Sequence, residues 1–265
     1  MIDFFGNQSF TSVQYLEDTT LTLPQAVSKF TSLAAQTGVF VGRINDLNQC
    51  VTMQSSNQNS LFNTASIFKT WVLGGVARAV QNEQLASATS VVLDGTKNVA
   101  GSVITSAPNG TVFNVGDLTT MMMGNSDNTA TDIMHSLAGR AVVDQIFTDF
   151  NMAQPTIMTP LLGISEQFHF IFNVSSTNRN AYLSGTESFQ QNFLQTDLIS
   201  RGRFTGGTLS DNALLNTATW KATPVDICNA FAALSRFPEK STSLRLIDRA
   251  LGAQTAQPFV RNQWN

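Results

Sequence analysis

The chain has 265 residues, of which 42% are hydrophobic and 9% are aromatic, so it has enough apolar side chains for a sizeable core in one large domain or two intimate subdomains. Its 15 Lys and Arg residues and 18 Asp and Glu residues give a formal net charge of −3, which offers no electrostatic reason to expect nucleic acid or an anionic membrane surface as a partner. No apolar run is long enough to span a membrane.

Helical periodicity, capping residues and turn signals divide the chain into many helices and one pair of strands. In the first part of the chain, the sequence predicts a helix at 24–36, a β-hairpin formed by 38–46 and 48–57, a helix at 66–81 and a loop at 94–116. Two helices follow within 115–139, separated at GNSDN, and then a helix at 140–150 and a loop at 151–163. The last part has helices at 165–174 and 188–200, a loop at 201–216, and helices at 223–237 and 242–252. Two strands are few for a chain of this length.

The cysteines, the histidines and the first residues place few limits on function. Cys50 and Cys228 lack the spacing of metal ligands, and we expect two buried thiols, with a single disulfide between them as the alternative. His135 and His169 are too few for a His-rich metal site. The first ten residues, MIDFFGNQSF, lack the basic start and long apolar centre of a signal peptide, so we expect a cytoplasmic protein or a chain that begins after a removed signal.

Ser66 and Lys69 form a Ser-x-x-Lys motif at the start of the predicted helix 66–81. Residues three apart lie on one face of a helix, so the Lys69 amine could reach the Ser66 hydroxyl and, when neutral, take its proton. The partial positive charge at the helix N-terminus would favour the resulting alkoxide. The alternative is purely structural, because Ser is a common N-cap and Lys three residues later is commonplace.

Ser126, Asp127 and Asn128 form a Ser-Asp-Asn motif in the predicted break between two helices, where polar side chains can project into a cleft. There the Ser126 hydroxyl could pass a proton to a leaving group, and Asn128 could hold a substrate carbonyl. The ordinary alternative is loop and N-cap chemistry. The same tripeptide recurs at 210–212 in a Gly-rich loop. We interpret this second copy as unrelated to the site, because no pair of apolar helices flanks it.

The segments that carry these motifs, TASIFKTWVL and MMMGNSDNTATDIMHSLAGR, resemble those of the class A serine β-lactamases and the penicillin-binding proteins. The motifs occur in the family order, and Ser126 follows Ser66 by 60 residues, as in class A sequences. The segment ATPVDICNAFAAL (222–234) is similar to the family's Thr-Pro-x-Asp helix. The resemblance covers roughly residues 24–252.

The resemblance implies roles for four residues. Ser66 would be the acyl-accepting nucleophile, Lys69 the base or proton relay beside it, Ser126 the proton shuttle to the leaving nitrogen, and Asn128 a substrate-orienting amide. The backbone N–H of Ser66 would supply one donor of the oxyanion hole. No metal or organic cofactor is implied, and the family's usual location is periplasmic or secreted.

The sequence departs from the family in two places. The family's Glu-x-x-Leu-Asn motif, whose glutamate activates the deacylating water, has no counterpart in 151–170, where Glu166 is the single carboxylate and is expected at a helix start behind Ser165. The family's Lys-Thr-Gly motif has two imperfect candidates, WKATP (220–224) and RFTGG (203–207), and both precede the Thr-Pro-x-Asp helix. We therefore expect an acyl-enzyme that hydrolyses slowly. We also expect that the sequence is truncated, or that a separate segment completes the sheet.

The expected fold is mixed α/β and β-lactamase-like, with one catalytic domain over 1–265. A helical subdomain at 66–212 would pack on a small antiparallel sheet flanked by helices, in three α-β-α layers, with 24–65 and 213–265 in the sheet-containing part and the C-terminal strands missing. The expected activity is opening of a β-lactam or a related amide or ester through an acyl-enzyme on Ser66, with a small molecule as substrate. The alternatives are a D-alanyl-D-alanine peptidase or esterase, and a non-catalytic binding module of this fold.

Overall fold

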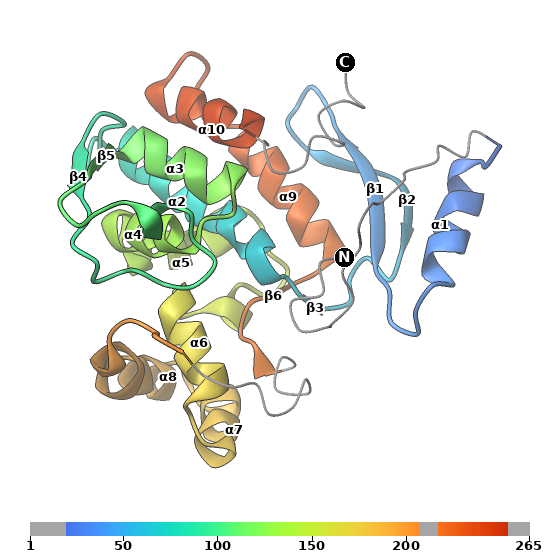
Figure 1. Ribbon diagram of the computed structural model, residues 1–265. Helices are drawn as coiled ribbons and strands as arrows, with labels where there is room; N and C mark the ends of the chain where they lie inside the picture. The colour runs from blue at the N-terminus through green and yellow to red at the C-terminus, as the bar shows by residue number, and fades with distance from the viewer. Residues whose placement is uncertain (1–19, 207–216, 254–265) are drawn as a thin grey trace.

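The computed structural model describes residues 20–206 and 217–253, and one end of it is a β-hairpin enclosed by two helices (Figure 1). The hairpin consists of β1 (Val39–Ile44) and β2 (Cys50–Ser56), which pair in antiparallel register. Helix α1 (Leu23–Thr31) packs on β2, and α9 (Pro224–Leu234) packs on β1. These layers confirm the predicted mixed α/β fold with a small antiparallel sheet flanked by helices.

The helical body is built around α2 (Lys69–Gln81), of which eleven of the thirteen residues are buried. A helix that is apolar on every side needs neighbours all round. Those neighbours are α3 (Val115–Gly124), α4 (Asn128–Ala138), α5 (Arg140–Asp149) and α10 (Thr242–Gly252). Gly75 permits the close approach of α5, because a Cβ atom there would lie 2.6 Å from Cγ2 of Val143.

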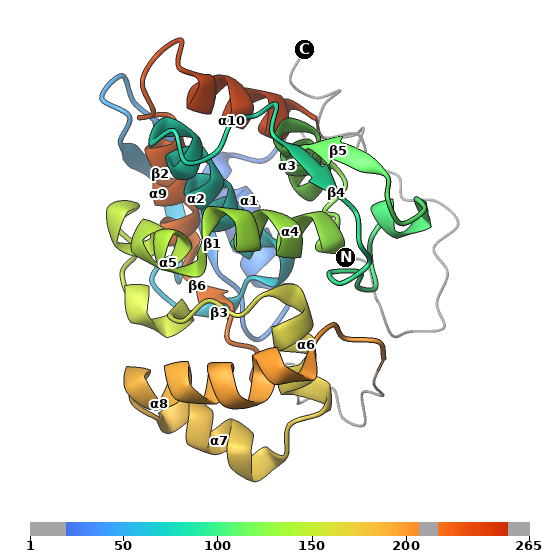
Figure 2. The same ribbon diagram turned by 90° about the vertical axis from the view of Figure 1, so that its left-hand side faces the viewer.

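Three further helices form a smaller unit below this body, between α5 and α9 in the chain (Figures 1 and 2). They are α6 (Ile164–Phe172), α7 (Ser176–Ser184) and α8 (Glu187–Phe193), and α8 continues through a π-type turn (Leu194–Leu198) and a 3-10 turn (Ile199–Arg201). The unit has its own apolar cluster, which consists of Leu162, Phe170, Val174, Tyr182, Leu194 and Leu198. The sequence did not predict α7, because its residues STNRNAYLS are mostly polar and bury only Arg179 and Tyr182.

Two short strand pairs were also missed by the sequence. Strand β3 (Phe62–Asn63) pairs with β6 (Lys221–Ala222), and β4 (Ser90–Val92) pairs with β5 (Val112–Asn114). The predicted loop at 94–116 is therefore wrong at its end, where β5 leads directly into α3. Strands of two or three residues are too short to show the alternation on which a strand prediction depends. Short 3-10 turns complete the description, at Ala65–Phe68, Ile104–Ser106 and Pro155–Met158.

Cys50 and Cys228 form a disulfide, so the expectation of two buried thiols is wrong. Their Cα atoms lie 5.9 Å apart, which is within the normal range for a disulfide. The bond joins the start of β2 to the middle of α9 across 178 residues of sequence. It therefore links the hairpin covalently to the helix that covers it.

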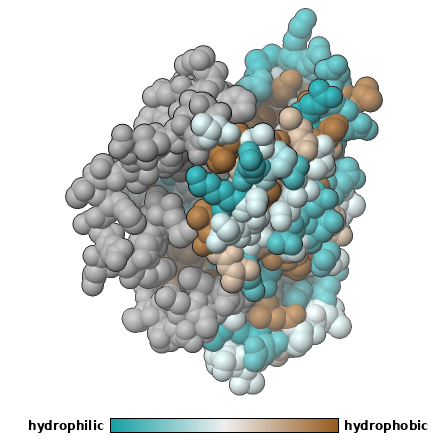
Figure 3. Space-filling model, turned by 90° about the vertical axis from the view of Figure 1, so that its right-hand side faces the viewer, coloured by the Kyte–Doolittle hydropathy of each residue, from teal (hydrophilic) through white to brown (hydrophobic). Residues whose placement is uncertain are grey.

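On the face that carries α1, hydrophobic and hydrophilic residues are interspersed, and the coloured residues form no single continuous apolar area (Figure 3). Phe30 of α1 and Leu33 just after it are exposed apolar side chains, while Val27 of α1 is buried. Among the described helices, none combines the length and the apolar character that a membrane span requires.

Candidate active site

Ser66 lies in the 3-10 turn Ala65–Phe68, immediately before α2. The sequence predicted that the α-helix starts at Ser66, and the structure places its start at Lys69. The side chain of Ser66 is exposed, whereas Phe68 and Lys69 are buried. Trp220 holds this turn in place, since its ring stacks on Phe68 at 4.0 Å between centroids and its carbonyl accepts a hydrogen bond of 3.0 Å from the Thr64 N–H.

Lys69 brings the two predicted motifs together. Its Nζ donates hydrogen bonds to the Ser126 carbonyl at 2.6 Å, to Ser126 Oγ at 3.0 Å and to Asn128 Oδ1 at 2.8 Å. An ammonium has three N–H donors, so this set satisfies all of them. Three of the four predicted site residues are thus in direct contact, and Ser66 stands in the preceding turn of the same segment.

Burial lowers the pKa of Lys69 to about 8, because the protein interior disfavours its charged form. The carboxylates of Asp127 and Asp132 act in the opposite direction and limit the shift. A lysine with an ordinary pKa of 10.5 is a poor acceptor of protons at neutral pH, and the lowered value makes the neutral amine more accessible. The surroundings of Lys69 therefore favour its use as a base.

The Ser-Asp-Asn segment has a backbone conformation that aims it at Lys69. Ser126 has a φ of +56°, the left-handed region that is uncommon for residues other than glycine. Asp127 is the N-cap of α4, and its carboxylate also accepts from the N–H groups of Val103 and Ile104 at 2.6 and 3.1 Å. The ordinary capping chemistry expected of this tripeptide is present at Asp127, while Ser126 and Asn128 point their polar atoms at the buried lysine.

Asn128 is held at both ends of its amide. Its Oδ1 accepts from Lys69, and its Nδ2 donates to the Ala100 carbonyl at 2.7 Å. Gly101 lies against it with a φ of +79°, and a Cβ atom at this position would be 2.6 Å from Asn128 Nδ2. Gly101 was not predicted as part of the site, since its only signal in the sequence is a glycine in a turn-rich stretch.

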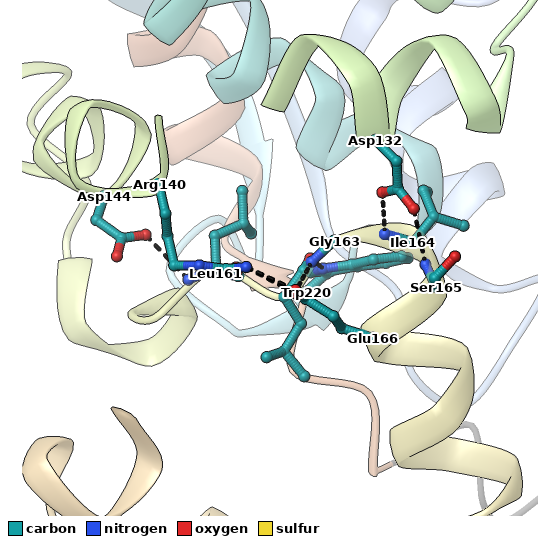
Figure 4. A network of polar contacts seen from close by, with 10 residues as sticks. Asp132, Arg140, Asp144, Leu161, Gly163, Ile164, Ser165, Glu166 and Trp220 are labelled. Atoms are coloured by element: carbon teal, nitrogen blue, oxygen red, sulfur yellow. Dashed lines mark hydrogen bonds and ion pairs between the residues drawn. The ribbon is translucent and has the colours of Figure 1, made fainter. Parts of the chain in front are cut away.

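Glu166 is engaged in a structural network at the start of α6, as expected for a residue at a helix terminus (Figure 4). Its carboxylate accepts two hydrogen bonds from Arg140, at 2.7 and 2.9 Å, and a third from the Gly163 N–H at 2.7 Å. Asp132 caps the same helix, since its two oxygens accept from the N–H groups of Ile164 at 2.6 Å and Ser165 at 3.0 Å. Neither carboxylate is hydrogen-bonded to Ser66 or Lys69.

The remaining predicted features lie elsewhere. Lys221 of the WKATP candidate is in β6, opposite Asn63 of β3. The second Ser-Asp-Asn copy at 210–212 and the last glycine of RFTGG lie outside the described residues. In the described part of the chain, no group of three or more His, Cys, Asp and Glu side chains is placed to hold a metal ion.

Comparison with known proteins identifies the fold. A model of the beta-lactamase enzyme family matches residues 23–258. A beta-lactamase from Chitinophaga pinensis is 16% identical, with a TM-score of 0.57, and the alignment covers 89% of this chain and 71% of that one. A beta-lactamase from Sphaerobacter thermophilus is 27% identical over 38% of each chain, with a TM-score of 0.37.

The Chitinophaga protein shares the fold at low sequence identity, and this chain spans only 38% of the Sphaerobacter protein. A search of curated proteins finds no match. The family model alone accounts for most of the sequence, from the start of α1 to beyond α10. The chain therefore belongs to the beta-lactamase enzyme family.

Proposed function

We propose that this chain is a serine hydrolase that forms an acyl-enzyme on Ser66 from a β-lactam or a related amide or ester. The observation that carries the proposal is the convergence of Lys69 Nζ on Ser126 and Asn128, next to the exposed Ser66. A buried lysine bound to a serine hydroxyl and an amide oxygen is a costly arrangement for a purely structural purpose. The same arrangement would have a chemical use if Lys69 relays a proton from the Ser66 hydroxyl to the Ser126 hydroxyl.

In the proposed acylation, Ser66 Oγ attacks the substrate carbonyl while neutral Lys69 takes the hydroxyl proton. The bond from the carbonyl carbon to the leaving nitrogen or oxygen then breaks. The leaving atom receives a proton from Ser126 Oγ, and Lys69 returns the proton that it holds to Ser126. The Ser66 N–H would donate to the oxyanion, and the second N–H of Asn128 Nδ2 would orient the substrate.

The carboxylates near the start of α6 favour a long-lived acyl-enzyme. Glu166 is hydrogen-bonded to Arg140 and Gly163, and Asp132 to two backbone N–H groups, so both carboxylates already hold the start of α6 and neither is hydrogen-bonded to Ser66 or Lys69. Acylation would therefore be faster than deacylation. This observation supports a second candidate, a D-alanyl-D-alanine peptidase or esterase, which also forms an acyl-serine and has no need to destroy β-lactams quickly.

Intact mass spectrometry tests the proposal directly. The protein is incubated with a chromogenic cephalosporin or a fluorophosphonate, and we expect one covalent adduct per chain. Ser66→Ala should abolish the adduct, while Ser60→Ala, which changes another exposed serine nearby, should retain it.

The time course separates the two candidates. Fast colour development with a transient adduct indicates a β-lactamase, and a persistent adduct indicates a peptidase-like enzyme. An adduct that survives on the Ser66→Ala protein, or its complete absence from the parent, would refute acylation at Ser66. Complete absence would favour a binding module.

A further inference from the structure

A pocket lies beside α4, between this helix, the start of α6 and the segment that follows α8. Its volume is about 460 Å³. Asp132 and His135 of α4 line it together with Ser165, Glu166, Lys97 and Arg203. Ser66, Lys69, Ser126 and Asn128 are not among its lining residues, so it is distinct from the proposed active site.

The two carboxylates of this α4–α6 pocket already have hydrogen-bond partners within the protein (Figure 4). Both oxygens of Glu166 accept from Nη2 of Arg140, and Glu166 also accepts from the Gly163 N–H. Each oxygen of Asp132 accepts from a backbone N–H at the start of α6. These contacts hold the start of α6 against α4 and α5, and Arg140 compensates the charge of Glu166.

The positive charges at the pocket's edge are less constrained. Lys97 and Arg203 are exposed, and neither forms an ion pair with another residue of the described chain. The nearby Asp94 is hydrogen-bonded to Thr96, which leaves the Lys97 ammonium with only a longer-range attraction to it. The edge therefore presents two cations toward solvent at the mouth of a hollow.

Two buried polar atoms of the pocket residues also lack a hydrogen-bond partner in the described structure. They are Nε2 of His135 and Oγ of Ser165, whose residues are 5% and 8% exposed. Buried polar atoms in folded proteins nearly always have partners, so these two atoms are available to a polar group bound in the cavity. Burial, together with the charges of Arg140 and Lys97, lowers the pKa of His135 to about 3, so its imidazole is neutral, and in one of its two tautomers Nε2 carries the proton.

We infer that the α4–α6 pocket binds a small oxyanion, such as a carboxylate or phosphate group. Lys97 and Arg203 would attract it at the mouth, and Ser165 Oγ–H and His135 Nε2–H would donate to its oxygens. The inference is independent of the proposed acylation of Ser66. It assigns a ligand class to residues that the hydrolase chemistry does not use.

Titration of the full chain with inorganic phosphate, and separately with acetate, at constant ionic strength tests the inference. We expect saturable binding by calorimetry and a matching rise in the melting temperature. The double variant Lys97→Gln/Arg203→Gln should weaken binding by about tenfold, as expected for the loss of two exposed charge interactions. Ser165→Ala should weaken it by about fivefold, the scale of one hydrogen bond to a charged group.

Arg43→Gln is the matched control, because Arg43 is an exposed arginine on β1 outside the pocket, and it should leave the dissociation constant unchanged. Circular dichroism checks that each variant is folded. A preference for phosphate or for acetate would identify which oxyanion the pocket suits, and either preference supports the site. The inference is overturned if neither anion binds saturably, or if the folded double variant binds as tightly as the parent.

Discussion

Lys69 occupies an apolar environment in which a charge is expensive. Phe68, Trp71 and Val72 beside it are essentially inaccessible to solvent, and Lys69 itself is only 2% exposed. Its ammonium is stabilised by one carbonyl, one hydroxyl and one amide oxygen, and by no directly bound carboxylate. Neutral acceptors compensate less for burial than a carboxylate would, so the proton is held less tightly than in an exposed lysine. Chemistry that depends on neutral Lys69 must therefore depend on pH.

We predict that acylation of Ser66 rises with pH and levels off above about pH 8, where Lys69 becomes mostly neutral. Below that value, each pH unit lowers the neutral fraction by about tenfold. The measurement is the rate constant for fluorophosphonate labelling between pH 5.5 and 9.5, with pH values chosen around the pKa of about 8. Lys69→Arg cannot lose its proton in this range and should show a low, flat profile. A flat profile in the parent protein would exclude Lys69 as the base.

A substitution at Gly101 tests whether the rate of acylation depends on the position of the Asn128 amide. An alanine Cβ would lie 2.6 Å from Asn128 Nδ2, so Gly101→Ala should displace the amide that Lys69 contacts. We expect acylation to slow by about 10–100-fold, since small misplacements in a catalytic site have effects on this scale. Gly110→Ala is the matched control, because Gly110 also has a positive φ of +92° but an alanine Cβ there would meet nothing within 4 Å. Both variants place an alanine at a positive φ, and equal acylation rates in the two would contradict the prediction.

At the scale of elements, the start of α6 is attached to α4 and α5 by carboxylates. Asp132 of α4 holds the N–H groups of Ile164 and Ser165, and Asp144 of α5 accepts from the Leu161 N–H at 2.9 Å (Figure 4). Burial raises the pKa of Asp132 and Asp144 to about 6 in each case. These hydrogen bonds therefore depend on two carboxylates whose ionised forms cost free energy in the folded protein.

We predict that Asp144→Asn changes how stability depends on pH. The pKa of Asp144 is raised from 3.8 to about 6, so the folded state binds its proton more tightly than the unfolded state does. Its contribution to stability is therefore greatest below about pH 4 and is lost as the pH rises through 6. The loss is at most ~3 kcal/mol by the size of the shift. Asparagine keeps an acceptor for Leu161 without this titration.

Chemical denaturation below pH 4.5 and again at pH 7 measures the effect. The free energy of unfolding of Asp144→Asn, relative to the parent, should rise between the two conditions. Asp46→Asn, an exposed carboxylate in the hairpin turn, serves as the control and should show no such rise. If the relative stability of Asp144→Asn is the same at both pH values, the titration of Asp144 does not affect folding.

The sequence predicted the long elements well and the short ones poorly, for a physical reason. The apolar residues of α2, α9 and α10 recur over eleven or more residues, and the Thr-Pro cap at α9 is present as a capping box between Thr223 and Asp226. By contrast, β3 and β6 exist only because each pairs with the other across the chain. Local patterns do not encode such pairs. The Ser-x-x-Lys and Ser-Asp-Asn motifs are local patterns that can be read in the sequence, whereas the stacking of Trp220 on Phe68 joins distant segments and was not predictable.

At the scale of the whole molecule, α9 joins the helical body around α2 to the layered end, which is the hairpin of β1 and β2 together with α1. This helix contacts α2 on one side and β1 on the other, and Thr223 at its start follows the strand that pairs beside Ser66. The disulfide from Cys228 to Cys50 adds a covalent link between α9 and the hairpin. Neither cysteine has a local sequence signal for this pairing, which explains why two thiols were expected. The position of the predicted boundary at residue 212 stays a prediction, because it lies outside the described residues.

We predict that the disulfide is a major source of stability for the layered end. A bond that closes a loop of 178 residues strongly restricts the unfolded chain, and loss of a native disulfide typically costs ~2–5 kcal/mol. Cys50→Ser/Cys228→Ser should therefore lower the free energy of unfolding by about this amount, as measured by urea denaturation without reductant. Adding reductant should destabilise the parent to the level of the double variant and leave the variant unchanged. Hydrogen exchange should locate the change in β1, β2 and α1 rather than in α2, because only the former depend on the hairpin's attachment to α9. Equal stability of parent and variant under oxidising conditions would mean that packing of α9 on β1 holds the hairpin without the covalent link.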